Sequence, residues 1–181
     1  MNNVVNLLLS QVLWLAAVGG AAHGQPWLGP LVLVIFALVQ LSPRFRARGD
    51  ALLMTLALPV GFVVDTVMAF TGLLRYASPF PDEALAPVWI VSLWMGFALT
   101  FNHSLAYVMR RWWLAVGLGA LVGPFSYWLA SRTWAAVHFT DSLPVVLITL
   151  GALWGVAMGL FSYFTMRLAH PPIPPSNGAC A

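Results

Sequence analysis

The chain has 181 residues, of which 61% are hydrophobic and only 7% are charged, and its mean hydropathy is +0.87. About a quarter of the residues in a soluble domain are charged, so this composition excludes an ordinary soluble protein and indicates a membrane protein. All eight positively charged residues are arginines, and the formal net charge is +3. The sequence has no basic patch interleaved with aromatic residues, which nucleic-acid binding would require. The positive charge therefore favours loops that face an anionic membrane leaflet.

Six apolar runs, each about as long as a membrane-spanning helix, follow one another along the chain. The first is expected to be retained rather than cleaved as a signal peptide, because the start MNNVVN carries no Lys or Arg. The second is short, with two prolines at its start. The predicted spans are Val4 to Ala22, Trp27 to Leu41, Ala51 to Leu74, Pro87 to Val108, Trp112 to Ala130 and Leu143 to Leu168.

These runs predict an all-α fold: a polytopic transmembrane helix bundle of about six spans. Residues 1–169 form a single domain, and residues 170–181, with the sequence HPPIPPSNGACA, are expected to form a flexible proline-rich tail.

Arginine placement predicts the orientation. With both termini cytoplasmic, six of the eight arginines lie inside, as the positive-inside rule requires. The six are Arg44, Arg46, Arg48, Arg110, Arg111 and Arg167, whereas Arg75 and Arg132 lie outside.

Polar side chains inside the spans sort into two depths when each helical residue contributes about 1.5 Å of rise. Asp65 lies about 21 Å above the cytoplasmic end of its span, level with Ser126 and Tyr127. His103 lies only about 8 Å up, level with Ser10, Gln11 and Ser162. We therefore expect two polar layers, too far apart for Asp65 and His103 to act as a catalytic dyad.

Helical spacing indicates that both layers face the protein interior. Gly61, Asp65 and Ala69 share one face of their span, and Ser92, Gly96, Thr100 and His103 are expected to share one face of the next. Small residues let helices approach closely in lipid. The spacings Gly151, Gly155, Gly159 and Gly119, Gly123 likewise predict packing within the chain, with a dimer interface as the alternative.

Asp65 is the most informative single residue, since an ionised carboxylate at a helix centre costs roughly 2.5 to 3.5 kcal/mol in lipid. It is either protonated or paired with Arg132 or Arg75 reaching down from the outer boundary. A proton or cation relay, a ligand anchor and a hydrogen-bonded structural role all stay open. His103, between Asn102 and Ser104, either joins neighbouring helices or acts as an acid or base.

No metal site or cofactor is expected. The other three histidines lie in loops or the tail, which argues against a bis-His haem. His23, His138 and Asp141 do not have the spacing of a known metal site.

Three segments carry a family resemblance: GFVVDTVMAFTGLL, APVWIVSLWMGFALTFNHSL and GPFSYWLASRTWAAVHF. Through them the chain resembles a bacterial family of inner-membrane proteins, domain of unknown function 2878, from about Asn6 to Tyr163. The resemblance implies a bundle of about six spans in the bacterial inner membrane and no established activity. It also hints, through neighbouring genes, at lipid-modifying enzymes such as cyclopropane-fatty-acyl-phospholipid synthases as partners.

Three functional hypotheses remain. The first is a protein that handles or transports a lipid or small solute through a polar interior. The second is an integral-membrane enzyme, or an accessory subunit, in fatty-acyl modification, and the third is a membrane scaffold for a partner enzyme. The candidate ligand-binding or polar-interior residues are Asp65, Asn102, His103, Ser104, Ser126, Tyr127, Gln11, Ser162 and Arg132.

Overall fold

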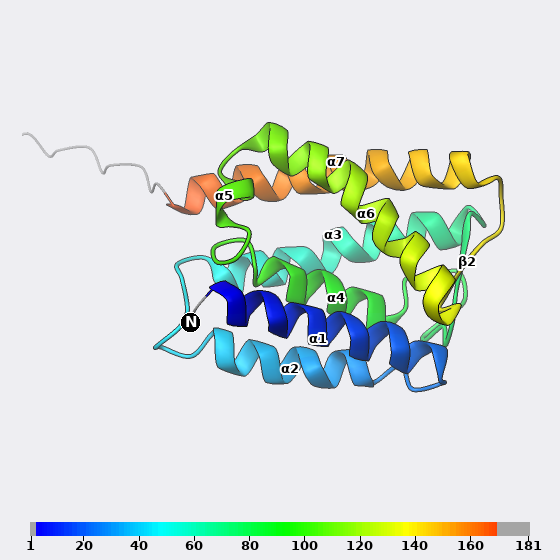
Figure 1. The fold of residues 1–181 in the computed structure, drawn as a ribbon, viewed down its shortest axis with the longest axis horizontal. Helices are drawn as coiled ribbons and strands as arrows, with labels where there is room; N and C mark the ends of the chain where they lie inside the picture. Colours follow the sequence, from blue (N-terminus) through cyan, green and yellow to red (C-terminus); the bar gives the residue numbers. More distant parts are fainter. Residues whose placement is uncertain (1–2, 170–181) are drawn as a thin grey trace, which may run out of the picture.

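The chain folds as a bundle of helices that run along one axis, with a small two-stranded ribbon at one end (Figure 1). The computed structural model describes residues 3–169, and the predicted tail 170–181 lies outside them. Both ends of the described chain lie at the same end of the bundle (Figure 1). The elements are α1 (Asn3–Ala22), α2 (Leu28–Gln40), α3 (Asp50–Phe70), β1 (Leu74–Tyr76), α4 (Val88–Ala98), α5 (Ala106–Met109), α6 (Trp112–Trp134), β2 (Val137–Phe139) and α7 (Leu143–Ala169).

Four of the helices, α1, α3, α6 and α7, are long and apolar enough to cross a membrane. The predicted all-α fold is therefore confirmed, and four of its described helices have the length and composition of membrane spans. The helices α2 and α4 have only 13 and 11 residues. At about 1.5 Å per residue, each is shorter than the roughly 30 Å hydrocarbon core.

The short helix α4 is the centre of the bundle. It packs against α1, α2 and α3, and Figure 1 shows it between the α1–α2 pair and α3. None of its eleven residues is exposed. A helix that is apolar on every side is stable only when it is surrounded in this way.

The prediction of one continuous helix from Pro87 to Val108 is wrong. The helix α4 ends at Ala98, and turns connect it to the single-turn helix α5. The Thr100 hydroxyl donates to the Phe97 carbonyl, and short polar side chains of this kind compete with helical hydrogen bonds. Consequently, Thr100 and His103 do not continue the α4 face that carries Ser92 and Gly96.

The glycines of α6 and α7 pack these two helices against each other. A Cβ atom on Gly151 would lie 2.9 Å from the Ala120 carbonyl oxygen, and one on Gly119 would lie 2.5 Å from Met158 Cγ. The helices approach so closely only because these positions carry no side chain.

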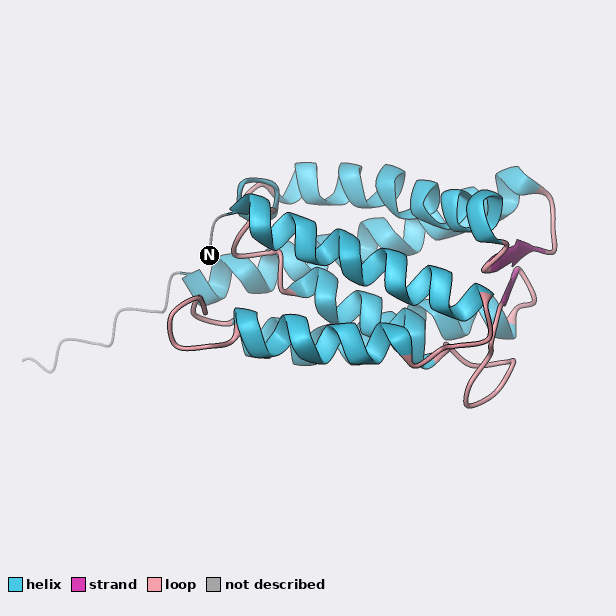
Figure 2. Cartoon of the chain, turned by 60° about the horizontal axis from the view of Figure 1, so that its bottom comes forward, coloured by secondary structure: helices cyan, strands magenta, loops and turns pink. Residues whose placement is uncertain are grey.

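The ribbon at the far end of the bundle was not predicted. β1 pairs with β2 in antiparallel register, with Arg75 opposite His138 (Figure 2). The Thr140 hydroxyl also donates to the Gly72 carbonyl. Three-residue strands are too short to show an alternating pattern, and Leu74 reads in the sequence as the end of the third span. The ribbon ties the α3–α4 connection to the α6–α7 connection.

Candidate functional site

Asp65, in the C-terminal half of α3, lies at the junction of four elements. Its carboxylate is fully buried and accepts three hydrogen bonds. The hydroxyls of Tyr76 and Tyr127 donate to Oδ1 at 2.8 and 2.5 Å, and the indole of Trp94 donates to Oδ2 at 2.6 Å. The carboxylate therefore links α3 to β1, α6 and α4.

Of the two alternatives for Asp65, pairing with Arg132 or Arg75 does not occur among the described residues. The strand alternation of β1 turns Leu74 and Tyr76 inward and leaves Arg75 exposed. Arg132 is also exposed, with its guanidinium 6.0 Å from the ring of Trp128. Three uncharged donors thus take the place of a cation.

Tyr76 lies outside the helices, and burial raises the pKa of its hydroxyl well above the usual value, with the nearby Asp65 adding to the shift. The phenol therefore keeps its proton at physiological pH and remains a donor to the carboxylate. Tyr76 and Trp94 are not among the site residues predicted from the sequence. Tyr76 lies between the third and fourth predicted spans, and Trp94 lies within an apolar run. A deep tryptophan needs an acceptor for its N–H, and this requirement is the signal that could have paired Trp94 with Asp65.

A stacked pair of indoles lies beside the carboxylate. The rings of Trp94 and Trp154 have centroids 4.2 Å apart and an interplanar angle of 28°. Each ring fits against a glycine: a Cβ on Gly61 would lie 2.2 Å from Trp94, and one on Gly123 would lie 2.5 Å from Trp154. The N–H of Trp154 is buried and interacts with the hydroxyl of Tyr127, although no hydrogen bond of good geometry forms there among the described residues.

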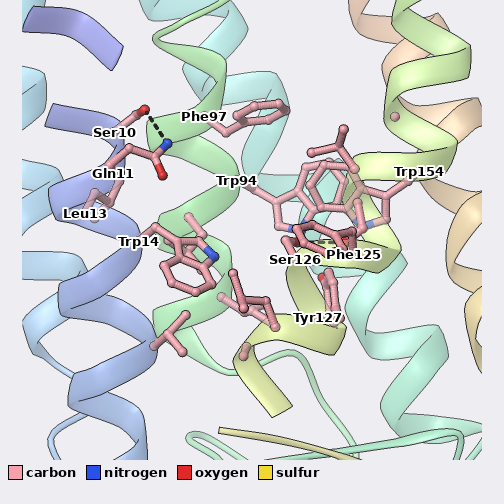
Figure 3. Close-up of a pocket in the computed structure, with 18 of the residues that line it drawn as sticks. Ser10, Gln11, Leu13, Trp14, Trp94, Phe97, Phe125, Ser126, Tyr127 and Trp154 are labelled. Atoms are coloured by element: carbon pink, nitrogen blue, oxygen red, sulfur yellow. Dashed lines mark hydrogen bonds between the residues drawn. The ribbon is translucent and has the colours of Figure 1, made fainter. Parts of the chain in front are cut away.

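A cavity of about 400 Å³ lies between α1 and α6, with α4 behind it (Figure 3). The Trp94–Trp154 pair and Tyr127 are at one side of it, and Ser10 and Gln11 are at the other (Figure 3). The described residues that line the cavity include no Arg, Lys, Asp or Glu. Its wall is therefore apolar and aromatic, with a few uncharged polar groups.

The cavity opens on the outside of the bundle. Several of its lining side chains are also exposed at the surface: Val122 and Phe125 of α6 are each 56% exposed, and Gln11 of α1 is exposed as well. The mouth is thus between α1 and α6, among the apolar side chains that a membrane would surround.

The structure places three predicted site residues, Gln11, Ser126 and Tyr127, in the cavity wall. Asp65 lies behind that wall and holds two wall residues, Trp94 and Tyr127, through hydrogen bonds. The sequence predicted Asp65 and Tyr127 at the same depth, and in the structure their side chains are hydrogen-bonded. Arg132 does not belong to this group.

A second polar group lies around Asp50 at the start of α3, at the end of the bundle that holds both ends of the described chain and that we call the inner end. Asp50 Oδ2 lies 2.8 Å from His103 Nε2 and accepts the Ala47 N–H at 2.7 Å, while Oδ1 accepts the Asn102 amide at 2.9 Å. The Ser104 hydroxyl donates to Asn6 of α1 at 2.7 Å. This cluster thus joins the predicted triplet 102–104 to α1 and α3.

His103 forms no hydrogen bond with the three residues predicted to lie at its depth. Ser10 and Gln11 line the cavity instead, and the Ser162 hydroxyl donates to the Met109 carbonyl. The depth estimate failed because the chain leaves the helix at Ala98, so the rise of 1.5 Å per residue no longer applies. Sequence reasoning missed Asn6, Gln40 and Asp50, although each is a polar residue near the inner end of an apolar run.

His103 has two competing neighbours at one ring nitrogen. Its Nε2 lies 2.8 Å from Asp50 Oδ2 and also 2.8 Å from the Gln40 amide nitrogen. The Gln40 amide is fixed in orientation, because its nitrogen donates to the Phe45 carbonyl and its oxygen accepts from Asn6. When His103 Nε2 carries a proton, it can donate to Asp50. When Nε2 carries a lone pair, it can accept from the Gln40 amide, so only one of the two hydrogen bonds forms at a time.

The two polar groups share no residue, in keeping with the prediction of separate layers. Among residues 3–169, no three His, Cys, Asp or Glu side chains lie close enough together to hold a metal ion.

Comparison with known families supports the resemblance carried by the three sequence segments. A family model described as a protein of unknown function (DUF2878) matches residues 3–160, which include the carboxylate cluster, the cavity and the inner cluster. A search of curated proteins and a search of solved structures each find no match. The chain belongs to the DUF2878 family.

Proposed function

We propose that the chain crosses the membrane six times: the four long helices each cross it, the short helix α2 forms the second crossing, and α4, the turns after it and α5 form the fourth. Two observations support this arrangement. The segments run antiparallel in succession along one axis (Figure 1), and the turns of residues 99–105 are shielded inside the bundle, where irregular backbone is tolerated at membrane depth.

The proposed orientation puts both termini in the cytoplasm of a bacterial cell, with the protein in the inner membrane. The loop with Arg44, Arg46 and Arg48 lies at the same end of the bundle as Arg110 and Arg167. This clustering of cations at one end is what the positive-inside rule requires.

Within that arrangement, the protein binds the hydrocarbon chain of a membrane lipid in the cavity between α1 and α6. The carrying observation is a cavity of about 400 Å³ with an apolar lining and a mouth among exposed apolar side chains. This volume lies within the roughly 300 to 1,000 Å³ of small-molecule sites. A chain can enter sideways from the bilayer without passing through water.

The energetic argument for occupancy is the cost of a void. If the cavity held no chain, the side chains that line it would lose the packing contacts that a filled site provides. A lipid chain gains little by moving from one hydrocarbon medium to another, so its gain comes from restoring those contacts. Selectivity then depends on the shape of the wall.

The Asp65 cluster gives the wall its shape. Because the carboxylate holds both Trp94 and Tyr127, it fixes two rings that a chain would contact. Asp65 acts here as a positioning residue behind the site, and this role requires no proton or cation movement.

Cavity filling tests the proposal. Ser126→Phe places a ring in the cavity, since Ser126 lines it and its hydroxyl bonds only to the carbonyl of Gly123. The matched control is Val63→Phe, on a lipid-exposed face of α3 that does not line the cavity. Each variant is reconstituted with a phospholipid that carries a photoactivatable diazirine in its acyl chain, and cross-linked peptides are mapped.

We expect cross-links to α1 and α6 residues of the cavity in the parent protein and in Val63→Phe, and their loss in Ser126→Phe. Equal labelling of the cavity residues in all three proteins would contradict the proposed function.

A further inference from the structure

We propose that the lipid bound in the α1–α6 cavity carries a hydroxyl group on its chain, within the hydrocarbon layer, and that Gln11 and Trp14 of α1 hold this hydroxyl by hydrogen bonds. The inference rests on the proposed function, because it specifies the chemistry of the ligand at the same site. Its support comes from the unpaired polar groups of these two side chains, from their depth and from the absence of charge around them.

The amide of Gln11 is left almost without hydrogen bonds by the protein. The side chain is exposed and lines the cavity, where Figure 3 shows it beside Ser10. Its nitrogen lies 3.5 Å from the Ser10 hydroxyl, which is longer than an ordinary hydrogen bond, and that hydroxyl already donates to the Leu7 carbonyl. No described residue donates to the amide oxygen Oε1. Gln11 therefore offers an acceptor to a ligand.

Trp14 supplies a donor to the same part of the cavity. It follows Gln11 by three residues, so the two side chains lie on one face of α1, and both line the cavity (Figure 3). Among the described residues, the enclosed side-chain atoms that lack a hydrogen bond of good geometry are Trp154 Nε1 and Thr165 Oγ1. The N–H of Trp14 also has no acceptor there, but it is not one of these enclosed atoms and its ring is only half-buried. A ligand can therefore reach it.

The two groups together match a hydroxyl better than any other uncharged oxygen. A hydroxyl both accepts and donates, so one oxygen can take the N–H of Trp14 and give its own proton to Gln11 Oε1. A ketone or ester oxygen only accepts, and it would leave Gln11 Oε1 without a donor. The site is therefore expected to prefer a hydroxyl to a carbonyl.

The depth of the two side chains places this hydroxyl on the lipid chain. Gln11 and Trp14 lie near the middle of α1, which has 20 residues. At about 1.5 Å per residue, α1 is about as long as the roughly 30 Å hydrocarbon core that it crosses. Unpaired amide and indole groups are costly in that medium. Headgroup and glycerol oxygens stay near the membrane surface, so only a group on the chain itself can meet them.

The surroundings exclude an ionised partner for the two groups. The described residues that line the cavity include no Arg, Lys, Asp or Glu. A carboxylate or phosphate at this depth would be buried without a counter-ion, at a far higher cost than a hydroxyl. The ligand group is therefore uncharged.

Competition with the photoactivatable phospholipid tests the inference. Each nanodisc sample contains the protein, a fixed amount of that phospholipid and one of four phosphatidylcholine competitors that differ only in one chain. The four chains are stearoyl, stearoyl with a mid-chain hydroxyl, stearoyl with a mid-chain ketone, and stearoyl with a hydroxyl on the carbon next to the ester. The cross-links that Ser126→Phe removes measure how far each competitor displaces the probe from the cavity.

The decisive variants are Gln11→Leu, which keeps a side chain of similar size, and Trp14→Phe, which keeps a ring beside Trp134. Their matched controls are Thr55→Val, at an exposed position of α3, and Trp113→Phe, at an exposed position of α6. Neither control position lines the cavity. The plain stearoyl competitor is the internal control, because a misfolded variant or a collapsed cavity would weaken competition by all four lipids alike.

We expect the mid-chain hydroxyl lipid to compete at about one tenth of the concentration that the stearoyl lipid requires, the effect of one net hydrogen bond. The ketone lipid should fall between the two, and the lipid with the hydroxyl next to the ester should match stearoyl. Gln11→Leu and Trp14→Phe should each bring the mid-chain hydroxyl lipid close to stearoyl and leave stearoyl unchanged, whereas both controls should keep the preference.

The inference is overturned if the mid-chain hydroxyl lipid competes no better than stearoyl, or if the ketone lipid or the lipid with the hydroxyl next to the ester competes as well as it does. It is also overturned if either decisive variant keeps the full preference. If no cross-link in the cavity is lost in Ser126→Phe, the proposed function fails instead.

Discussion

Replacing Asp65 by asparagine tests whether the carboxylate holds the bundle together. Asparagine has the same shape, but one of its two acceptor oxygens becomes an amide donor. Three donors meet the carboxylate in the native protein, two at Oδ1 and one at Oδ2. Whichever way the amide is turned, at least one native donor loses its acceptor.

The expected cost follows from that count. A buried donor left without a partner costs about 1 to 3 kcal/mol, so Asp65→Asn should lower the free energy of unfolding by about that amount. Asp65→Ala would strand all three donors and could remove most of the roughly 5 to 15 kcal/mol that stabilises a typical domain. The asparagine variant is therefore the informative one.

The assay is reversible unfolding in mixed micelles of detergent and SDS, followed by circular dichroism. Asp82→Asn serves as the control, because Asp82 is exposed and its carboxylate caps only the N–H of Ala84; its effect should stay within about 0.5 kcal/mol. A double-mutant cycle with Tyr127→Phe should give a coupling energy of about 0.5 to 3 kcal/mol. An Asp65→Asn variant as stable as the parent, or a coupling near zero, would refute the reasoning.

Two further predictions concern the inner end of the bundle. Asp50→Asn and His103→Ala should each lower the free energy of unfolding. Because the two side chains share one contact of 2.8 Å, the double variant should lose less than the sum of the two single losses, by about 0.5 to 3 kcal/mol. Strictly additive losses in the same unfolding assay would contradict this. In a Cys180→Ser background, a membrane-impermeant thiol reagent applied to intact cells should label Glu83→Cys and spare Arg46→Cys, and the reverse pattern would overturn the proposed orientation.

The helices could be predicted because the apolar runs are long and the loops between them are polar. All six runs contain a helix near the expected residues, and the predicted start of the first, Val4, is within one residue of the start of α1. The early end of α4 was not foreseen. Between Val88 and Phe97, eight apolar residues and a glycine are interrupted only by Ser92. The hydropathy therefore stays high up to the point where polar side chains at 100–104 redirect the backbone.

The contacts of the candidate site could be predicted only where two residues lie on regular helices. Depth along two helices correctly brought Asp65 and Tyr127 to one level. The same arithmetic failed for His103, which lies in turns, and for Tyr76, which lies in a strand pairing that only tertiary structure determines. Likewise, the cavity depends on how α1 and α6 are placed relative to each other, and the sequence pattern of neither helix predicts that placement.

A density map of the protein in lipid nanodiscs is the most direct measurement of whether the α1–α6 cavity holds a lipid. The account predicts an elongated density that enters beside Val122 and lies against the stacked rings of Trp94 and Trp154. A closed cavity, or one filled by protein side chains, would contradict it.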